Sequence, residues 1–310
     1  MTNELSDHFG DRLMAAVRVK KTPLVVGLDP RFKQIPEKLR LGVSDSAPEV
    51  AEVFRKFCFE IIDVVQGLVP AVKPQAAFFE QLGARGMQAL ADVIDYAVEA
   101  KLMVILDAKR GDIGSTAEAY ARAFLGRKPK SNWGCDGLTI NPYLGEDTLE
   151  PFVNRANETG SGVFVLVKTS NPGSHSLQEK ETHQGKVYGL VGQHVERLSA
   201  ASKGESGYGS VGAVVGATYP EQLAELRSAM PSTIFLVPGF GAQGGTAKDV
   251  EGGFDENGLG SIVNSSRGII FAHAKPEYTE LDCWQTAVEK ATLDSMDRLA
   301  ETTAGKLRSC

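Results

Sequence analysis

Cysteine is scarce in this sequence, and the few cysteines present form no recognisable pattern. The chain of 310 residues has four, at Cys58, Cys135, Cys283 and Cys310, and no two stand at the spacing of a zinc site or a redox pair. The five histidines form no H-x-x-x-H pair either, so no metal site is predicted. A chain of this length can fold without disulfides. We therefore expect reduced thiols and a cytoplasmic protein.

Long apolar runs and an excess of positive charge are also lacking. No apolar run approaches the ~18 residues that a transmembrane helix needs, and the N-terminal 20 residues lack the apolar region of a signal peptide. Lysine and arginine total 33 against 39 aspartates and glutamates, a net charge of −6. Proteins that bind nucleic acid nonspecifically are usually basic. We therefore expect neither a membrane nor nucleic acid as a partner, and an anionic small-molecule ligand would need a local cluster of donors.

Short apolar segments rich in valine, isoleucine and leucine alternate with segments of helical periodicity. The apolar segments are Leu24–Asp29, Pro70–Pro74, Leu102–Lys109, Gly137–Asn141, Gly162–Lys168, Val211–Gly216, Thr233–Val237 and Ser261–Asn264. Continuous apolar strands alternating with helices are typical of buried parallel sheets. Eight such units predict an α/β fold of the (β/α)8 TIM-barrel type, with a doubly wound open sheet as the alternative.

The barrel is expected to form one catalytic domain over residues 1–310. Residues 1–20 read as an N-terminal amphipathic helix, and residues 275–310 as a C-terminal helical extension. A packing helix in that extension is suggested by Trp284, Val288, Ala291 and Leu293.

Charged residues stand where the expected strands end, which is where a (β/α)8 barrel places its active site. Asp107 and Lys109 are two residues apart at a strand end, so both point to the same side. Asp112 follows a glycine at which the chain can turn back, and Lys73 ends another strand. A lysine held between carboxylates keeps its proton firmly and is well placed to deliver it to a developing carbanion. We predict a catalytic group of these four residues; a structural ion-pair array is the alternative.

A glycine-rich loop, Pro238–Gly245, follows the seventh expected strand, and Arg267 follows the eighth. Glycines let backbone N–H groups crowd around an anion, and an arginine adds a bidentate donor. Loops at these two positions are a frequent phosphate site in barrels, so a phosphate site is predicted here. The loop also matches G-x-G-x-x-G, but only one strand follows it, which disfavours a dinucleotide fold. A simple tight turn is the remaining alternative.

Several of these segments resemble the orotidine 5′-phosphate decarboxylase family, in its longer bacterial subfamily. The resemblance is carried by DAKRGDIGST (107–116), VVGLDP (25–30), VKPQAAFFEQLG (72–83), TINPYLGEDTLEPF (139–152), KTSNPGS (168–174) and PGFGAQGG (238–245). It implies decarboxylation of orotidine 5′-phosphate to UMP and CO2, the last step of de novo UMP synthesis. It also implies no metal, no organic cofactor and a homodimer with active sites at the interface.

The resemblance further implies roles at the reacting end of the substrate. Lys109 matches the proton donor to C6 of the pyrimidine. Asp107 matches the carboxylate that faces the leaving CO2 and holds Lys109. Asp112 and Thr116 match residues that reach the ribose in the partner subunit's site.

The remaining implied roles concern substrate binding. Asp29 and Lys73 match the ribose-hydroxyl and charge-network positions, and Ser170 matches the pyrimidine contact. The phosphate contacts are matched by Gln243, Arg267 and the loop N–H groups around Gly241.

Two other functions fit the same residues. The D-x-K-x-x-D core is shared with related barrels that act on sugar phosphates, generally through Mg²⁺ and an enediolate, so a sugar-phosphate lyase or synthase is the second hypothesis. The third is a non-catalytic protein that binds a phosphate ligand, whose function would survive Lys109→Ala.

Overall fold

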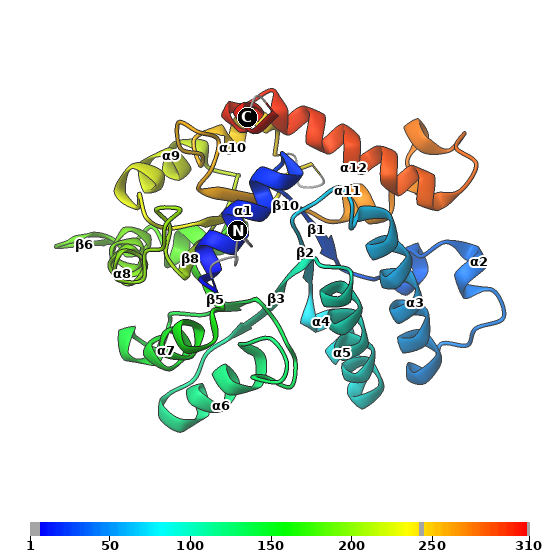
Figure 1. The fold of residues 1–310 in the computed structure, drawn as a ribbon, viewed down its shortest axis with the longest axis horizontal. Coiled ribbons are helices and arrows are strands. Elements are labelled where there is room, and N and C mark those ends of the chain that lie inside the picture. The colour runs from blue at the N-terminus through cyan, green and yellow to red at the C-terminus, as the bar shows by residue number, and fades with distance from the viewer. Residues whose placement is uncertain (1–6, 242–244, 309–310) are drawn as a thin grey trace, which may run out of the picture.

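The computed structural model describes residues 7–241 and 245–308. Parallel strands close into an eight-stranded barrel in the order β1-β2-β3-β4-β5-β8-β9-β10 (Figure 1). Their bounds are β1 (Leu24–Leu28), β2 (Ala71–Pro74), β3 (Met103–Arg110), β4 (Gly137–Ile140), β5 (Gly162–Lys168), β8 (Val211–Val215), β9 (Phe235–Pro238) and β10 (Ser261–Ser265). The predicted barrel is confirmed, and each strand overlaps the segment expected for it. The strands are buried almost throughout, which is why they read as continuous apolar runs.

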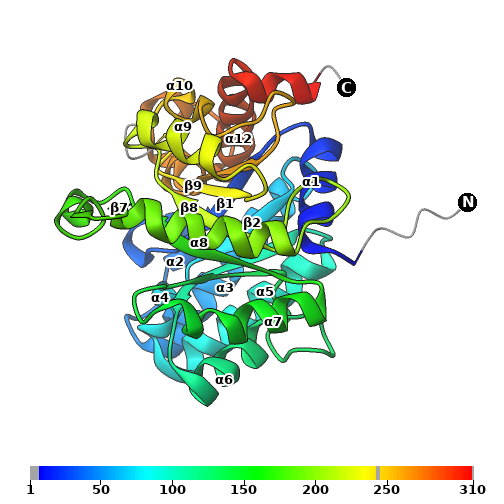
Figure 2. The ribbon, with the colours of Figure 1, turned by 90° about the vertical axis from the view of Figure 1, so that its left-hand side faces the viewer.

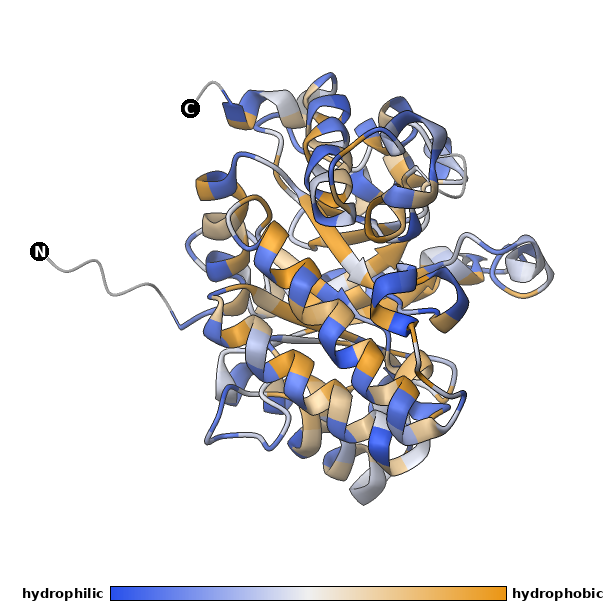
Figure 3. Cartoon of the chain, turned by 90° about the vertical axis from the view of Figure 1, so that its right-hand side faces the viewer, coloured by the Kyte–Doolittle hydropathy of each residue, from blue (hydrophilic) through white to orange (hydrophobic). Residues whose placement is uncertain are grey.

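Helices surround the barrel on the outside, with their apolar faces towards the strands (Figure 3). Their bounds are α1 (Phe9–Lys20), α2 (Glu37–Arg40), α3 (Ala47–Val65), α4 (Ala76–Glu80), α5 (Gly83–Glu99), α6 (Gly114–Phe124), α7 (Glu150–Thr159), α8 (Val187–Ala201), α9 (Pro220–Ala229), α10 (Ala247–Glu251), α11 (Arg267–Ile270) and α12 (Trp284–Ala300). The long helices α3 and α5 bury apolar residues at helical spacing, because one stripe of each faces the sheet.

The helix predicted over residues 1–20 is found as α1, from Phe9 to Lys20, which closes the amino-terminal end of the barrel (Figure 1). Residues 1–6 of the prediction lie outside the described residues. Phe9, Leu13 and Val17 on this helix are fully buried. The ring of Phe9 meets that of Phe164 edge-on, with centroids 5.9 Å apart. A Cβ at Gly162 would lie 2.2 Å from the Phe9 ring, so the start of β5 must be glycine for α1 to approach this closely.

The helix α12 lies in the expected C-terminal extension and packs on α3 and α11. Its buried face includes Trp284, Val288 and Ala291, and the indole of Trp284 lies 5.4 Å from the Phe57 ring. Leu293 is exposed, so the expectation that it packs with these residues is wrong. Leu293 follows Trp284 by nine residues, which places it on the opposite side of a helix with about 3.6 residues per turn.

An arm formed by residues 170–186 projects beyond the barrel between β5 and α8 (Figure 2). The sequence of this segment has no clear periodicity. The arm contains a short 3₁₀ helix, Pro172–Ser176, and the antiparallel pair β6 (Glu181–Thr182) and β7 (Gly185–Lys186). Strands of two residues are too short to show a sequence period, which is why no pattern marks them.

Candidate active site

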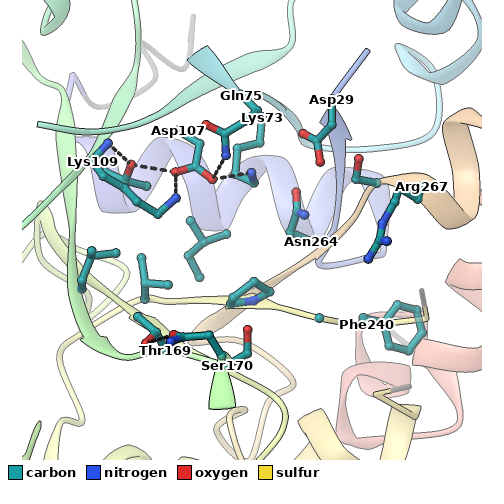
Figure 4. Close-up of a pocket in the computed structure, with 18 residues that line it drawn as sticks. Asp29, Lys73, Gln75, Asp107, Lys109, Thr169, Ser170, Phe240, Asn264 and Arg267 are labelled. Carbon is teal, nitrogen blue, oxygen red and sulfur yellow. Dashed lines mark hydrogen bonds and ion pairs between the residues drawn. The ribbon is translucent and has the colours of Figure 1, made fainter. Parts of the chain in front are cut away.

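A cavity of about 310 Å³ opens at the carboxyl ends of the barrel strands (Figure 4). The described residues that line it include Asp29, Lys73, Gln75, Asp107, Lys109, Thr139, Thr169, Ser170, Asn171, Gly239, Phe240, Asn264, Ser266 and Arg267. The strand-end rule used on the sequence therefore identifies the position of the cavity correctly.

The buried carboxylate of Asp107 is the centre of one wall. Oδ2 accepts hydrogen bonds from Lys73 Nζ at 2.7 Å and Gln75 Nε2 at 3.0 Å. Oδ1 accepts from Lys109 Nζ at 2.6 Å and Thr139 Oγ1 at 2.9 Å. Four donors thus hold one carboxylate in a single orientation, with an ammonium on each of its oxygens.

The charges of this group stabilise one another. Burial opposes ionisation of Asp107, but the charges of Lys73 and Lys109 hold its pKa well below the usual range. Burial alone would lower the pKa of Lys73, but Asp107 and Asp29 raise it above its ordinary value. Asp107 and Lys73 are therefore both charged at neutral pH.

The backbone at Lys109 adopts a conformation that a residue with a Cβ seldom takes. Its φ is +48°, and the pairing of β3 with β4 shifts register between Leu106 and Arg110. Thr139 Oγ1 supports the bend by accepting from the N–H groups of Ala108 and Lys109 at 3.1 and 3.0 Å. Strain of this kind persists where surrounding contacts enforce it, and it gathers at functional sites. The bend leaves the Lys109 side chain 47% exposed, while Lys73 is buried.

The β1 and β10 side of the cavity carries polar atoms without partners. Asp29 Oδ1, Asn264 Oδ1 and Ser266 Oγ are buried, and the described residues offer none of them a hydrogen bond. Gly27 makes room for this cluster, since a Cβ there would lie 2.7 Å from that of Ser266. Buried polar atoms without partners are costly, and a ligand with hydroxyl groups would satisfy them.

Two further walls come from the segment that follows β5 and from the segments that follow β9 and β10. Thr169, Ser170 and Asn171 follow β5 and line the cavity, and Figure 4 shows Thr169 and Ser170 at its edge. Arg267, the first residue of α11, lies across the cavity from Lys109, near Phe240. One end of the cavity therefore carries the Lys73–Asp107–Lys109 group and the other carries a guanidinium.

Several residues singled out in the sequence lie elsewhere. Asp112 and Thr116 are not among the described residues that line the cavity, and Asp112 Oδ1 instead accepts from the N–H of Ile113 at 2.8 Å. Among the described ion pairs, Lys109 bonds Asp107 and not Asp112. The sequence predicts that Lys109 lies between two carboxylates. Within this chain, the carboxylate of Asp107 instead lies between two lysines, Lys73 and Lys109. Gln243 lies outside the described residues.

The glycine-rich loop is folded onto itself. Gly241, with a φ of +80°, donates its N–H to the carbonyl oxygen of Gly245 at 2.9 Å, and Gly245 donates to Gly239 at 3.3 Å. Gly241 is not among the described residues that line the cavity. Its N–H would reach a phosphate only after this bond opens, so its predicted role stays a prediction.

Sequence reasoning missed Gln75, Thr139 and Asn264 as members of the site. Each stands at or just after a strand end, inside or beside a segment already singled out. Their uncharged side chains attract no attention in a sequence, although a search for every polar residue at a strand end would have found them.

Neither a metal-binding cluster nor a membrane-spanning helix is found among the described residues. In the part of the chain that the structure describes, no three histidine, cysteine, aspartate or glutamate side chains are grouped so as to hold a metal ion. None of the described helices is both long and apolar enough to span a bilayer.

The fold and the cavity define a (β/α)8-barrel protein with a site for an anionic small molecule. The model of the orotidine 5′-phosphate decarboxylase / HUMPS family matches residues 22–280. An orotidine 5′-phosphate decarboxylase of Rhodopirellula baltica is 52% identical, covering 94% of this chain and 98% of its own length. One from Caldicellulosiruptor bescii is 38% identical, covering 89% and 93%. The structure of Leishmania donovani OMP decarboxylase has a TM-score of 0.73 at 32% identity, covering 98% and 99%.

The chain belongs to the orotidine 5′-phosphate decarboxylase family. The resemblance found in the sequence is confirmed, and so is the predicted enzyme class, a decarboxylase.

Proposed function

We propose that the cavity converts orotidine 5′-phosphate to UMP and CO2, and that Lys109 supplies the proton that C6 gains. The observation that carries the proposal is the Lys73–Asp107–Lys109 group at one end of a cavity with Arg267 at the other. The substrate has matching charges, a carboxylate on the pyrimidine and a phosphate on the ribose. Its ribose hydroxyls would meet the partnerless atoms of Asp29, Asn264 and Ser266.

The chemical step follows from the charges. The electrons of the bond between C6 and the carboxylate stay on C6 as CO2 departs, and the ring offers them no sink. An ammonium already aimed at C6 stabilises that charge as it develops and then transfers its proton to the carbon. Lysine regains a proton from water, so the balance is substrate plus one proton to UMP plus CO2.

Asp107 contributes in two ways under this proposal. Its hydrogen bond fixes the position of the Lys109 ammonium. Its charge also repels the substrate carboxylate, and that repulsion ends when neutral CO2 forms, so the interaction favours the transition state over the ground state. Binding energy from the distant phosphate offsets the repulsion in the bound substrate.

The test is the fall in orotidine 5′-phosphate absorbance with purified protein, in the presence and absence of EDTA. We expect rapid loss that EDTA leaves unchanged, because no step of the proposed chemistry uses a metal. Turnover that EDTA abolishes would overturn the cofactor-free mechanism. Absence of turnover from folded protein would direct attention to sugar-phosphate substrates with Mg²⁺.

We also propose that two copies of the chain pair so that Asp112 and Thr116 of each reach the other's cavity. Ile113, which follows Asp112 in the chain, has an exposed side chain. In the loop after β4, Tyr143 and Leu144 are exposed as well. The loops after β3 and β4 are adjacent, since the N–H of Asn141 donates to the carbonyl oxygen of Arg110. Large apolar side chains exposed beside a cavity are typical of an interaction surface.

Mixing two inactive variants tests the shared site. Asp112→Ala and Lys109→Ala proteins should each lack activity, and a mixture should recover part of it, because some mixed dimers carry one intact site. Light scattering and subunit exchange followed with a labelled chain provide the control. Verified mixed dimers without activity would contradict the shared site.

A further inference from the structure

Lys168, the last residue of β5, is a buried cation that the proposed chemistry does not use. The residue is 0% exposed. Its ammonium donates to Ser174 Oγ at 2.8 Å, pairs with Glu179 Oε1 at 3.1 Å, and lies 4.2 Å from the centroid of the Tyr219 ring. Lys168 is not among the described residues that line the cavity. Burying an ammonium costs free energy, and an apolar side chain at such a position often gives equal or greater stability. Stability alone therefore does not explain a lysine at residue 168.

Two of these three contacts of the ammonium lie on the arm, the segment that begins with Ser170, and the third, Tyr219, stands just before α9. Ser174 belongs to the 3₁₀ helix of the arm, and Glu179 follows it. Between them, Gln178 forms a reciprocal pair with Thr169: its Oε1 accepts from the Thr169 N–H at 2.9 Å, and its Nε2 donates to Thr169 Oγ1 at 2.8 Å. The arm is thus fastened back onto the end of β5 at two adjacent residues.

The fastened segment is also braced from the other side. The Gly216 N–H donates to the carbonyl oxygen of Lys168 at 2.8 Å. A Cβ at Gly216 would lie 2.9 Å from that of Ser170, so the glycine lets Ser170 lie directly against the end of β8. Ser170 and Asn171, the first residues of the arm, are therefore held between its fastened part, Ser174–Glu179, and the β8 end. Both line the cavity, and Figure 4 shows Ser170 at its edge.

We propose that Lys168 is a positioning residue for recognition of the pyrimidine base. Through Glu179 and Ser174 it fixes the arm, and the arm fixes Ser170 and Asn171 at the cavity edge. The ribose-phosphate half of a ligand would instead meet Asp29, Asn264 and Arg267, which do not depend on the arm. The inference rests on the proposed function and on the contact between Ser170 and the base that the family resemblance implies, and it goes further by assigning the base half of the ligand to the Lys168 link.

Lys168→Met tests the proposal, because methionine fills a similar space and leaves the Glu179 side chain, 27% exposed, able to reach water. Calorimetry would measure the Kd of UMP and of ribose 5-phosphate, which lacks the base. We expect UMP binding to weaken by roughly tenfold and ribose 5-phosphate binding to stay unchanged. The KM for orotidine 5′-phosphate should rise by a similar factor with a much smaller change in kcat.

Glu179→Ala breaks the same link from the arm and should reproduce this pattern, so it carries the test if Lys168→Met fails to fold. Glu179→Gln keeps an acceptor for the ammonium and should restore most of the binding. Lys290→Met, which removes an exposed ion pair with Asp294 on α12, is the matched control and should bind both ligands normally.

The results of these experiments distinguish the role of Lys168 from the contact between Ser170 and the base. Equal weakening of UMP and ribose 5-phosphate, or no weakening of either, would overturn the role of Lys168. Ser170→Ala should weaken UMP selectively. If it does not, the base contact itself is wrong and the positioning role falls with it. Failure of wild-type protein to bind UMP would instead contradict the proposed function.

Discussion

The two ends of this barrel each bury an aspartate between two cations, yet only one end is suited to chemistry. At the mouth, Asp107 lies between Lys73 and Lys109. At the base, Asp136 Oδ1 accepts from Arg12 at 2.6 Å and from Arg127 at 2.9 Å. The comparison shows which features of a buried ion group belong to structure and which to function.

At the base of the barrel, both carboxylate oxygens of Asp136 accept hydrogen bonds, and the group is closed to solvent. Asp136 is 0% exposed, and its Oδ2 accepts from the Val104 N–H at 3.0 Å. Arg12 also donates to the carbonyl oxygen of Gly160 at 2.7 Å, which joins α1 to the start of β5. The contacts made by Arg12 and by the Val104 N–H join segments distant in the chain, so the group holds the barrel together.

The mouth is different in both the cations and the surroundings. Arginine holds its proton under all ordinary conditions and binds in a fixed fork, whereas the ammonium of lysine is a compact charge that can transfer a proton. Lys109 is half exposed on a strained backbone, and partnerless polar atoms face the same cavity. The group at the mouth therefore has what a reaction needs, a lysine that faces the cavity and can transfer a proton.

Lys109→Ala is expected to have the largest effect of any change in this comparison. It should lower kcat by roughly 10³-fold or more, about 4 kcal/mol of transition-state stabilisation, because the cation nearest the developing charge is lost. The protein should still fold and bind UMP, measured by circular dichroism and calorimetry. A near-wild-type kcat would eliminate Lys109 as the proton donor.

Asp136→Ala should destabilise the fold and leave the rate of the reaction unchanged. Removing one partner of a buried ion group costs about 3–5 kcal/mol, so we expect a clear fall in the melting temperature and an unchanged kcat per folded molecule. Asp95→Ala removes the exposed pair with Lys128 and is the control, with a cost below about 1 kcal/mol. Equal melting temperatures for the two variants would contradict the structural role assigned to Asp136.

The smallest expected effect is a difference in pH dependence at the mouth. The folded pKa of Asp107 is depressed, so its stabilising contribution is present above the unfolded pKa of about 3.9 and is lost as the pH falls through the folded pKa. The folded pKa of Lys73 is raised, so its contribution is present below the unfolded value of about 10.4 and is lost at higher pH. Between these limits neither group changes charge.

Chemical denaturation of wild type and Asp107→Asn at several pH values measures this directly. The difference in unfolding free energy should be constant from about pH 5 to pH 9 and should shrink below about pH 4. A difference that already shrinks between pH 7 and pH 5 would mean that Asp107 takes up a proton in the working range, contrary to the charge state assigned here.

Much of the fold and half of the site could be predicted from the sequence, for identifiable reasons. Parallel strands buried on both faces leave continuous apolar runs, so all the barrel strands were visible. Asp107 and Lys109 are two residues apart at a strand end, and this spacing alone places both on one side of β3. The predicted pairing of Lys109 with Asp112 is not found among the described ion pairs, since Asp112 Oδ1 accepts from the Ile113 N–H within one chain.

The remaining features depend on contacts between distant segments. The partners of Asp136 come from α1 and from the loop before β4, and no local pattern connects them. Lys168 pairs with Glu179 only because the arm folds back onto β5. The sequence of the arm has no periodicity from which this fold could be predicted. Uncharged residues such as Gln75 and Thr139 acquire a role only through the carboxylate they hold.

The most direct test of the central claim follows C6 of the product. If Lys109 delivers the proton, the reverse transfer must also occur, so wild-type protein in D2O should exchange the C6 hydrogen of bound UMP for deuterium, seen by proton NMR. Lys109→Ala should bind UMP without this exchange. Exchange by Lys109→Ala at the wild-type rate would show that another group handles the proton and would contradict the account.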